Sequence, residues 1–287
     1  MKKKMALLLA AALTMTTILT GCGGGNEENA DKQSDVTAED AKEENASGDS
    51  VSEGGTVFTV GFDAEYPPYG YMDENGEYTG FDLELAQAVC DLEGWELVKK
   101  PINWDSKDME LNSGSIDCIW NGFTMNGRED DYTFSDSYVD NSQVIVVAED
   151  SGIDTLDALA GKVVGVQAAS AALELLQSEE EGGQKALADT FGSLNEFADY
   201  NTAFTELQAG ALDALAIDIG VAKYQIKSRG DGYKIVDETL NTEQYAVAFK
   251  KGNQELCDKI NADLQKLTDD GTVAELAEKY EIADMVT

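Results

Sequence analysis

Histidine is absent from this chain of 287 residues, and its absence removes several kinds of catalytic and metal site. Without an imidazole the chain cannot build a Ser-His-Asp triad, a Cys-His pair or a histidine-ligated metal centre. Chemistry that needs only carboxylates stays open, because Asp and Glu are abundant. We therefore expect neither a metal nor a cofactor, and a binding role ahead of a catalytic one.

Basic residues are scarce as well, since Lys and Arg total 20 against 56 Asp and Glu, a formal net charge of −36. Such a surface repels phosphate backbones, so the composition argues against a nucleic-acid partner. A solvated acidic surface accounts for this excess, which by itself does not indicate a cationic ligand. The length is sufficient for two lobes with separate cores.

Long hydrophobic runs are missing except near the start of the chain. Three lysines at positions 2–4 precede an apolar run at 5–19, which is the pattern of a secretory signal and is short for a membrane span. The run ends at Leu19-Thr20-Gly21-Cys22, which resembles the bacterial lipoprotein box. We expect residues 1–21 to be removed as a signal peptide and Cys22 to carry a lipid. The alternative is an ordinary signal peptide with an incidental cysteine.

The next segment, residues 22–55, contains almost nothing to bury, being made mostly of Gly, Asn, Glu, Asp, Ser, Lys and Ala. Such a composition cannot offset the entropy lost on ordering. It predicts a flexible acidic tether that keeps a globular part close to a membrane.

Three further cysteines, Cys90, Cys118 and Cys257, remain in the globular part. Cys90 and Cys118 each lie in an apolar stretch, which favours buried thiols. One disulfide with one free thiol is the alternative, because the number is odd.

From residue 56 onward, β-rich segments alternate with segments of helical periodicity. The expected strands are Thr56–Phe62, Trp95–Val98, Ile116–Trp120, Ser142–Ala148, Lys162–Gln167, Asp213–Ile217 and Gln244–Phe249. The expected helices are Phe81–Leu92, Ser106–Asn112, Leu156–Ala160, Ser170–Gln177 with Ser170 as N-cap, Thr202–Ala209, Val221–Ser228, and a last helix with Leu256, Ile260, Leu264 and Leu267 on one stripe that ends at Gly271. This alternation predicts largely parallel sheets, and its restart after a break at 149–152 predicts two α/β lobes.

The residues Gly80-Phe81-Asp82-Leu83-Glu84-Leu85 open one expected helix with acids in its first turn, which suits the helix dipole. Four further blocks follow a fixed order in the chain: Asp63 with Tyr66-Pro67-Pro68-Tyr69, Gly114-Ser115-Ile116-Asp117, Phe134-Ser135-Asp136-Ser137-Tyr138, and Gly210-Ala211-Leu212-Asp213-Ala214. Together, over residues 56–279, they resemble the bacterial extracellular solute-binding proteins of family 3.

The resemblance implies an α/β, two-lobed periplasmic-binding-protein-like fold of type II, with the ligand in the interlobe cleft. Lobe 1 would comprise residues 56–143 and 244–287, and lobe 2 residues 144–243. The two hinge crossings would lie near Ser142–Val144 and Glu243–Tyr245.

A pocket for a free amino acid has to pair an α-carboxylate and an α-ammonium. An arginine fork meets a carboxylate with two parallel hydrogen bonds, which lysine cannot do. The resemblance implies that Arg128 is this arginine, that Thr124 adds its amide and hydroxyl to the carboxylate, and that Gly122 offers its carbonyl to the ammonium. The alternative for Arg128 is an exposed side chain paired with Glu129 or Asp131.

Five other residues are implied as ligand contacts. Asp218, at the end of an expected strand, would bind the ammonium, and Asp63 would contact the ammonium or the side chain of the ligand. Ser170 would begin a helix whose free amides bind the carboxylate. Tyr66 and Trp104 would sandwich the ligand side chain, with ordinary core packing as the alternative.

The function implied is that of an extracellular lipoprotein, not an enzyme, that binds a free amino acid by hinge closure and presents it to an ABC permease. The candidate residues include no second Arg or Lys, which argues against an acidic ligand and favours a polar or cationic side chain. We expect a monomer on the outer face of the cell membrane of a Gram-positive bacterium, held by its N-terminal lipid. The alternatives are a lyase of the same fold, similar to the cyclohexadienyl dehydratases, and a ligand-sensing subunit that signals to a membrane partner.

Overall fold

The computed structural model describes residues 55–230 and 232–287. The predicted signal peptide, Cys22 and nearly all of the predicted tether lie outside the described residues. Residues 50–287 group as one unit, and the fold is that of the described part of this unit.

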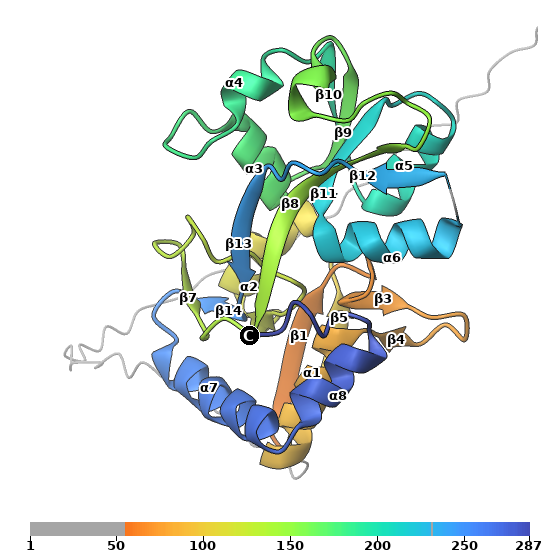
Figure 1. The fold of residues 1–287 in the computed structure, drawn as a ribbon. Coiled ribbons are helices and arrows are strands. Elements are labelled where there is room, and N and C mark those ends of the chain that lie inside the picture. Colours follow the sequence, from red (N-terminus) through yellow and green to blue (C-terminus); the bar gives the residue numbers. More distant parts are fainter. Residues whose placement is uncertain (1–54, 231) are drawn as a thin grey trace, which may run out of the picture. The chain divides into compact units, whose positions relative to one another are not determined.

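The first lobe is built around a five-stranded sheet in the order β5-β1-β6-β14-β7. Its strands are β5 (Glu96–Pro101), β1 (Val57–Phe62), β6 (Cys118–Ile119), β14 (Ala248–Lys250) and β7 (Tyr132–Phe134). Strand β1 runs parallel to β5 and β6, whereas β14 runs antiparallel to β6 and β7. Four helices accompany this sheet (Figure 1): α1 (Phe81–Glu93), α2 (Lys107–Ser113), α7 (Gln254–Asp269) and α8 (Thr272–Lys279). A small antiparallel sheet joins β2 (Glu65–Tyr66), β3 (Gly70–Met72) and β4 (Tyr78–Thr79).

The second lobe is built around a sheet in the order β10-β9-β11-β8-β12, with β13 also paired to β8. Its strands are β10 (Ser193–Phe197), β9 (Val163–Gln167), β11 (Ala214–Asp218), β8 (Val139–Ala148), β12 (Tyr233–Ile235) and β13 (Asn241–Tyr245). The helices of this lobe are α3 (Ala171–Gln177), α4 (Lys185–Ala188), α5 (Tyr200–Gln208) and α6 (Ile219–Arg229). Strands β9, β10 and β11 are mutually parallel, but β8 is antiparallel to each of its neighbours.

Two antiparallel strands connect the lobes. Strand β8 leaves the first lobe after β7. Strand β13 leads back to it, and two residues separate the end of β13 from the start of β14. The two strands lie side by side between the sheets (Figure 1), with Asn141 opposite Glu243 and Gln143 opposite Asn241. They contain the positions expected for the two crossings, Ser142–Val144 and Glu243–Tyr245.

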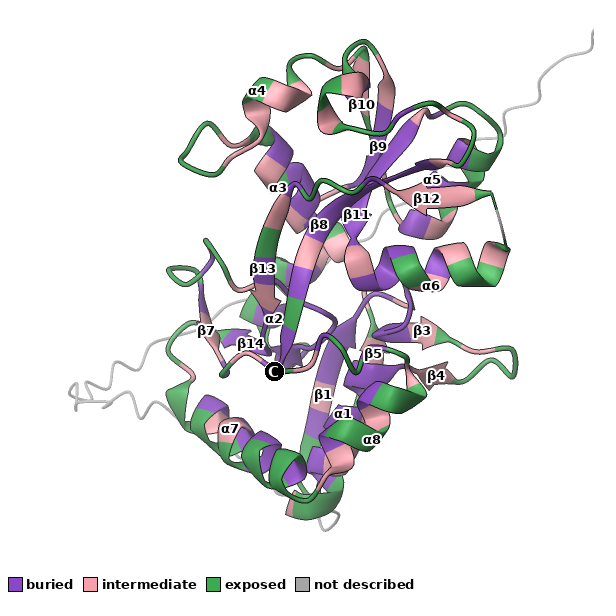
Figure 2. Ribbon diagram, in the orientation of Figure 1, coloured by how far each residue is buried: buried purple, intermediate pink, exposed green. Residues whose placement is uncertain are grey.

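The cores follow from the sequence pattern of the strands and helices. The central strands of both sheets are buried on both faces (Figure 2), and in β8 the run Val144–Val147 is wholly buried. Such continuous burial suits β-branched residues covered by helices on either side. Helix α7 buries Cys257, Ile260, Leu264 and Leu267 and exposes its other face, as its periodicity predicts, while Leu256 is half-buried.

Most expected elements are confirmed, with shifts at their ends. Ser170 caps α3 as predicted, since its Oγ accepts a hydrogen bond from the Leu173 amide at 3.1 Å. The prediction of one strand over Gln244–Phe249 is wrong, because the chain changes sheets after Tyr245 and starts β14 at Ala248.

Three further expectations need correction. The segment beginning at Leu156 is a short 3₁₀ turn, not an α-helix. Gly271, at φ 91°, ends α7 but is followed at once by the unpredicted helix α8. The sheets are mixed, because the crossing strand β8 and the returning strand β14 both run against their neighbours.

Candidate functional site

A small pocket lies between the two lobes, and residues of both line it. Its volume is about 10 Å³, room for little more than one water molecule. The lining residues are Tyr66, Trp104, Gly122, Phe123, Thr124, Arg128, Gln167, Ser170, Ala171 and Asp218. Seven of the eight predicted ligand residues therefore converge on one pocket, although they come from positions up to 152 apart (218 minus 66).

Arg128 provides the positive charge of this pocket. It follows the turn after β6 and is buried, with its guanidinium 4.7 Å from the centre of the Phe123 ring. Its Nε donates a hydrogen bond to Glu174 Oε2 at 3.0 Å, and its Nη2 makes an ion pair with the same oxygen at 2.8 Å. The alternative of an exposed arginine paired with Glu129 or Asp131 is thus wrong.

A pair of buried carboxylates, Asp218 and Glu243, provides negative charge at the strands that connect the lobes. The side-chain amides of Asn141 and Gln143 each donate to both Asp218 Oδ1 and Glu243 Oε1, over distances of 2.6–2.8 Å. The Tyr245 hydroxyl adds a hydrogen bond to Asp218 Oδ1 at 2.6 Å. All three of these donors reach the same oxygen, Oδ1.

Thr124 approaches the same pair from the first lobe. Its hydroxyl donates to Glu243 Oε1 at 2.7 Å. Burial, and next the charge of Asp218, raises the pKa of Glu243 from 4.5 to about 7. Two carboxylates that share the same amides repel each other, and a cation beside them relieves that repulsion.

Asp63 lies at the end of β1 and contacts the second lobe. Its Oδ2 accepts a hydrogen bond from Gln167 Nε2 at 2.7 Å, and its Oδ1 accepts one from the Glu65 amide at 2.9 Å. Burial raises the pKa of Asp63 to about 6, although both hydrogen bonds act to lower it. It does not line the small pocket but an adjoining hollow of about 690 Å³, whose other acidic residues are Glu65, Asp105, Glu110, Glu196 and Asp199.

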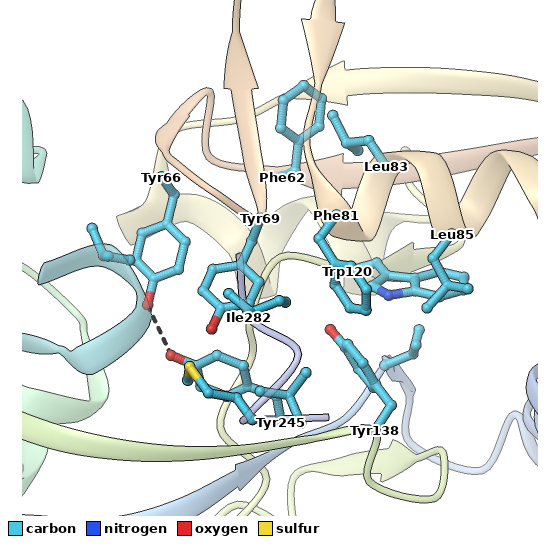
Figure 3. Close-up of a cluster of buried hydrophobic side chains, with 14 of the residues drawn as sticks. Phe62, Tyr66, Tyr69, Phe81, Leu83, Leu85, Trp120, Tyr138, Tyr245 and Ile282 are labelled. Atoms are coloured by element: carbon cyan, nitrogen blue, oxygen red, sulfur yellow. Dashed lines mark hydrogen bonds between the residues drawn. The ribbon is translucent and has the colours of Figure 1, made fainter. Parts of the chain in front are cut away.

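Tyr66 and Gly122 form a close-packed side of the pocket. The Tyr66 hydroxyl lies 3.3 Å from that of Tyr245, and the rings of Tyr66, Tyr69 and Tyr245 point toward one another (Figure 3). Gly122 has φ 56°, and a Cβ at this position would lie 2.8 Å from the Tyr245 ring and 3.1 Å from the Tyr66 ring. Only glycine satisfies both constraints without a shift of these rings.

Trp104 lies in a 3₁₀ turn before α2 and meets Phe123 edge to ring, 5.6 Å between centres. The next turn places the buried Lys107 over the Trp104 ring, with Nζ donating to the Ala169 carbonyl of the second lobe at 3.2 Å. Burial and the neighbouring Arg128 lower the pKa of Lys107. A second cation therefore lies close to the pocket, and the sequence argument against an acidic ligand loses its basis.

Ser170 is buried between the pocket and its own helix. Its Oγ donates to the Gln167 carbonyl at 2.7 Å while capping α3. The hydroxyl is thus engaged within the protein, and a ligand contact through it stays a prediction.

Asp82, from the motif that opens α1, supports the pocket from behind. It is fully buried, and its Oδ2 accepts a hydrogen bond from the Gly122 amide. Burial raises the pKa of Asp82 to about 7, although this hydrogen bond acts to lower it. The acid in the motif thus holds the pocket turn in place and does not line the pocket.

Sequence reasoning missed Gln167, Phe123, Lys107, Glu174 and Glu243, which line or border the pocket. Phe123 and Gln167 adjoin predicted site segments, which was a usable signal. Glu174 and Glu243 looked like any of the 56 acidic residues.

Known proteins resemble this chain over most of its length. The family model described as bacterial extracellular solute-binding proteins, family 3, matches residues 58–282. This chain belongs to that family. The L-cystine-binding protein TcyJ of Escherichia coli K12 is 31% identical over 82% of this chain and 86% of its own length. The arginine-binding extracellular protein ArtP of Bacillus subtilis is 32% identical over 98% of both chains.

Solved structures agree. A substrate-binding protein of an ABC uptake transporter from Streptococcus pneumoniae, with bound histidine, superposes with a TM-score of 0.75 at 34% identity, over 80% of this chain and 94% of that chain. The type II fold predicted for this family-3 protein is thereby confirmed.

Three further observations concern the described part of this family-3 protein. Cys90, Cys118 and Cys257 are free and buried, so the buried-thiol interpretation is confirmed over the disulfide. No helix there is long and apolar enough to span a bilayer, and no cluster of three or more Cys, Asp or Glu is arranged for a metal.

The raised pKa values predict that the protein is more stable in mild acid. Asp82 and Glu243, at about 7, and Asp63, at about 6, ionise below pH 5 once unfolded, so unfolding releases protons between pH 5 and 7. Each such group contributes at most about 1.4 kcal/mol per pH unit in this window. We expect the free energy of unfolding to fall by roughly 2–5 kcal/mol from pH 5 to pH 7.5.

Urea unfolding at the two pH values measures this loss. Asp82→Asn should reduce this loss, because the amide oxygen still accepts from Gly122 but never ionises, whereas Glu243 and Asp63 still do. Asp73→Asn is the matched control, since Asp73 is exposed and its pKa is lowered by hydrogen bonds from Glu77 and Asn75, outside this window. Equal stability of the wild type at both pH values would contradict the prediction.

Proposed function

We propose that this protein captures a free L-amino acid between its two lobes and delivers it to the permease of an ABC importer. The observation that carries the proposal is the pairing of charges in one pocket, with the guanidinium of Arg128 and the carboxylate of Asp218 both on its lining. A free amino acid brings the complementary carboxylate and ammonium. The names of the relatives, which specify cystine, arginine and bound histidine, support the same class of ligand.

The ligand that we favour has a polar or cationic side chain. Asp63 and Trp104 line the adjoining hollow together with the other acidic residues. A ligand side chain that extends past Trp104 into this hollow therefore meets negative charge.

Binding would proceed by closure of the lobes about β8 and β13. We assign residues 56–143 and 244–287 to one lobe and 144–243 to the other. Contacts between the lobes at Asp63–Gln167 and Lys107–Ala169 support closure about this pocket.

We further propose that the protein acts outside the cell as a monomer on the outer face of the membrane of a Gram-positive bacterium. Lys2–Lys4, the apolar run and Cys22 support a cleaved signal and a lipid anchor, and residues 22–55 a flexible tether. Mass spectrometry of the protein from membranes tests this, because a lipid on Cys22 adds a defined mass that Cys22→Ala removes.

The test of ligand binding is thermal unfolding of the purified protein with each of the common amino acids, cystine and ornithine. Selective stabilisation by one or two of them, rising with concentration as linkage requires, is the expected result. Prephenate and arogenate serve as substrates for the rival lyase function, and their turnover would contradict a pure binding role. Stabilisation by none of the amino acids would contradict the proposal. Co-purification with a signalling partner instead of a permease would favour the sensing role.

A further inference from the structure

The guanidinium of Arg128, which the proposed ligand needs for its carboxylate, is already paired with a side chain of the protein itself. Glu174 projects from α3 of the second lobe and pairs with Arg128 of the first, through Nε at 3.0 Å and Nη2 at 2.8 Å. The contact joins the lobes at the pocket, and the charge of Lys107 lies near both partners.

The geometry of this pair is that of a weak substitute for a ligand carboxylate. Both nitrogens approach the same oxygen, Oε2, and Nη2 is buried without a hydrogen bond of good geometry. A free carboxylate that faces the fork can instead supply one oxygen to each N–H, which is the stronger arrangement.

The two partners also differ in their contact with solvent. The Arg128 side chain is 8% exposed, whereas that of Glu174 is 55% exposed. Glu174 can therefore turn into water at little desolvation cost, while Arg128 stays buried and has to be paired.

We propose that Glu174 is an affinity-determining residue that competes with the α-carboxylate of the ligand for Arg128. This inference rests on the proposed amino-acid binding. Glu174 stabilises lobe contact when no amino acid is present and leaves the guanidinium when one binds. Because the pair stabilises only the state without ligand, it lowers the apparent affinity.

The consequence distinguishes two kinds of ligand. A compound with an α-carboxylate has to displace Glu174, whereas an amine that lacks this group does not. Removal of the Glu174 carboxylate therefore strengthens the binding of amino acids and does not strengthen the binding of their decarboxylated forms.

The experiment compares the wild type with Glu174→Gln and Glu174→Ala by isothermal titration calorimetry. The probes are L-arginine, L-histidine, L-cystine and L-glutamine, with agmatine and histamine as the decarboxylated forms of the first two. For an amino acid that the wild type binds, both variants should bind about two- to fivefold more tightly, the range expected for a partly exposed ion pair. Glu206→Gln, at a half-buried glutamate of α5 in the same lobe, is the matched control and should match the wild type.

The separation of the lobes provides a second readout that needs no ligand. In small-angle X-ray scattering without amino acid, both Glu174 variants should have a larger radius of gyration than the wild type and the Glu206→Gln control. Added amino acid should bring all four proteins to the same compact value.

The outcomes separate the two proposals. Amino-acid binding by the wild type with equal or weaker binding by the Glu174 variants overturns the competition, as does equal strengthening for agmatine and histamine. If no protein binds any amino acid, the proposed function fails, and an unchanged radius of gyration then overturns the lobe contact as well.

Discussion

Replacement of Arg128 by alanine should lower amino-acid affinity by at least about a hundredfold while the protein stays folded. The guanidinium is the positively charged group that lines the pocket, and it lies buried against Phe123. Without it, the carboxylate of the ligand would enter a site that already contains Asp218 and Glu243, and the neighbouring Lys107, which donates to the Ala169 carbonyl, offers no fork to bind it. The fold should survive because Glu174, the partner left behind, is mostly exposed to water.

Calorimetric titration with the amino acid found by thermal unfolding measures this loss, and urea unfolding checks the fold. Arg128→Lys is the matched control, since it keeps the charge but not the fork and should fall between alanine and the wild type. An alanine variant that stays within about fivefold of wild-type affinity would contradict the role of Arg128.

The largest expected effect on stability comes from Gly80→Ala. Gly80 has φ 134°, a region that other residues rarely adopt, and a Cβ there would lie 2.1 Å from the Tyr69 carbonyl oxygen. The Tyr69 carbonyl cannot move freely, because it accepts the Asp82 amide at 3.1 Å at the start of α1. We expect a loss of about 3–5 kcal/mol in the free energy of unfolding.

Gly76→Ala is the control that separates the two causes of the loss in Gly80→Ala, namely the contact of the new Cβ and the unfavourable backbone conformation. Gly76 has φ 83°, but a Cβ added at this residue would have no heavy atom within 4 Å. It should lose only about 1–2 kcal/mol, the cost of the left-handed backbone alone. Urea unfolding of both variants decides the matter, and similar losses would show that contact with Tyr69 is unimportant.

Local pattern was sufficient for most of the fold. The stripe on α7, the Ser170 cap and the β-branched run in β8 were all visible in the sequence, because each depends on neighbours within one element. The split between β13 and β14 was not visible, since the chain is buried and apolar without a break from Tyr245 to Phe249. The chain changes sheets there because of the second lobe, which no short window of sequence contains.

The candidate site divides in the same way. Arg128, Thr124 and Asp218 were implied as site residues by the resemblance to the family, and all three line the pocket. Glu174 and Glu243 could not, since their importance arises from partners 46 and 119 residues away. An acidic residue in so acidic a chain gives no local indication that it faces a buried partner.

The amides of Asn141 and Gln143 have a consequence for how such a protein can change. They hold β8 and β13 together through Glu243 and at the same time orient Asp218 toward the pocket. A substitution of Asn141 or Gln143 that changes how Asp218 binds an ammonium therefore also changes the contacts between β8 and β13, the strands about which the lobes close. Ligand binding at Asp218 and lobe closure about β8 and β13 thus depend on the same side-chain amides. Substitutions around Asp63 and Trp104, which line the adjoining hollow, can change the preference among side chains without disturbing those contacts.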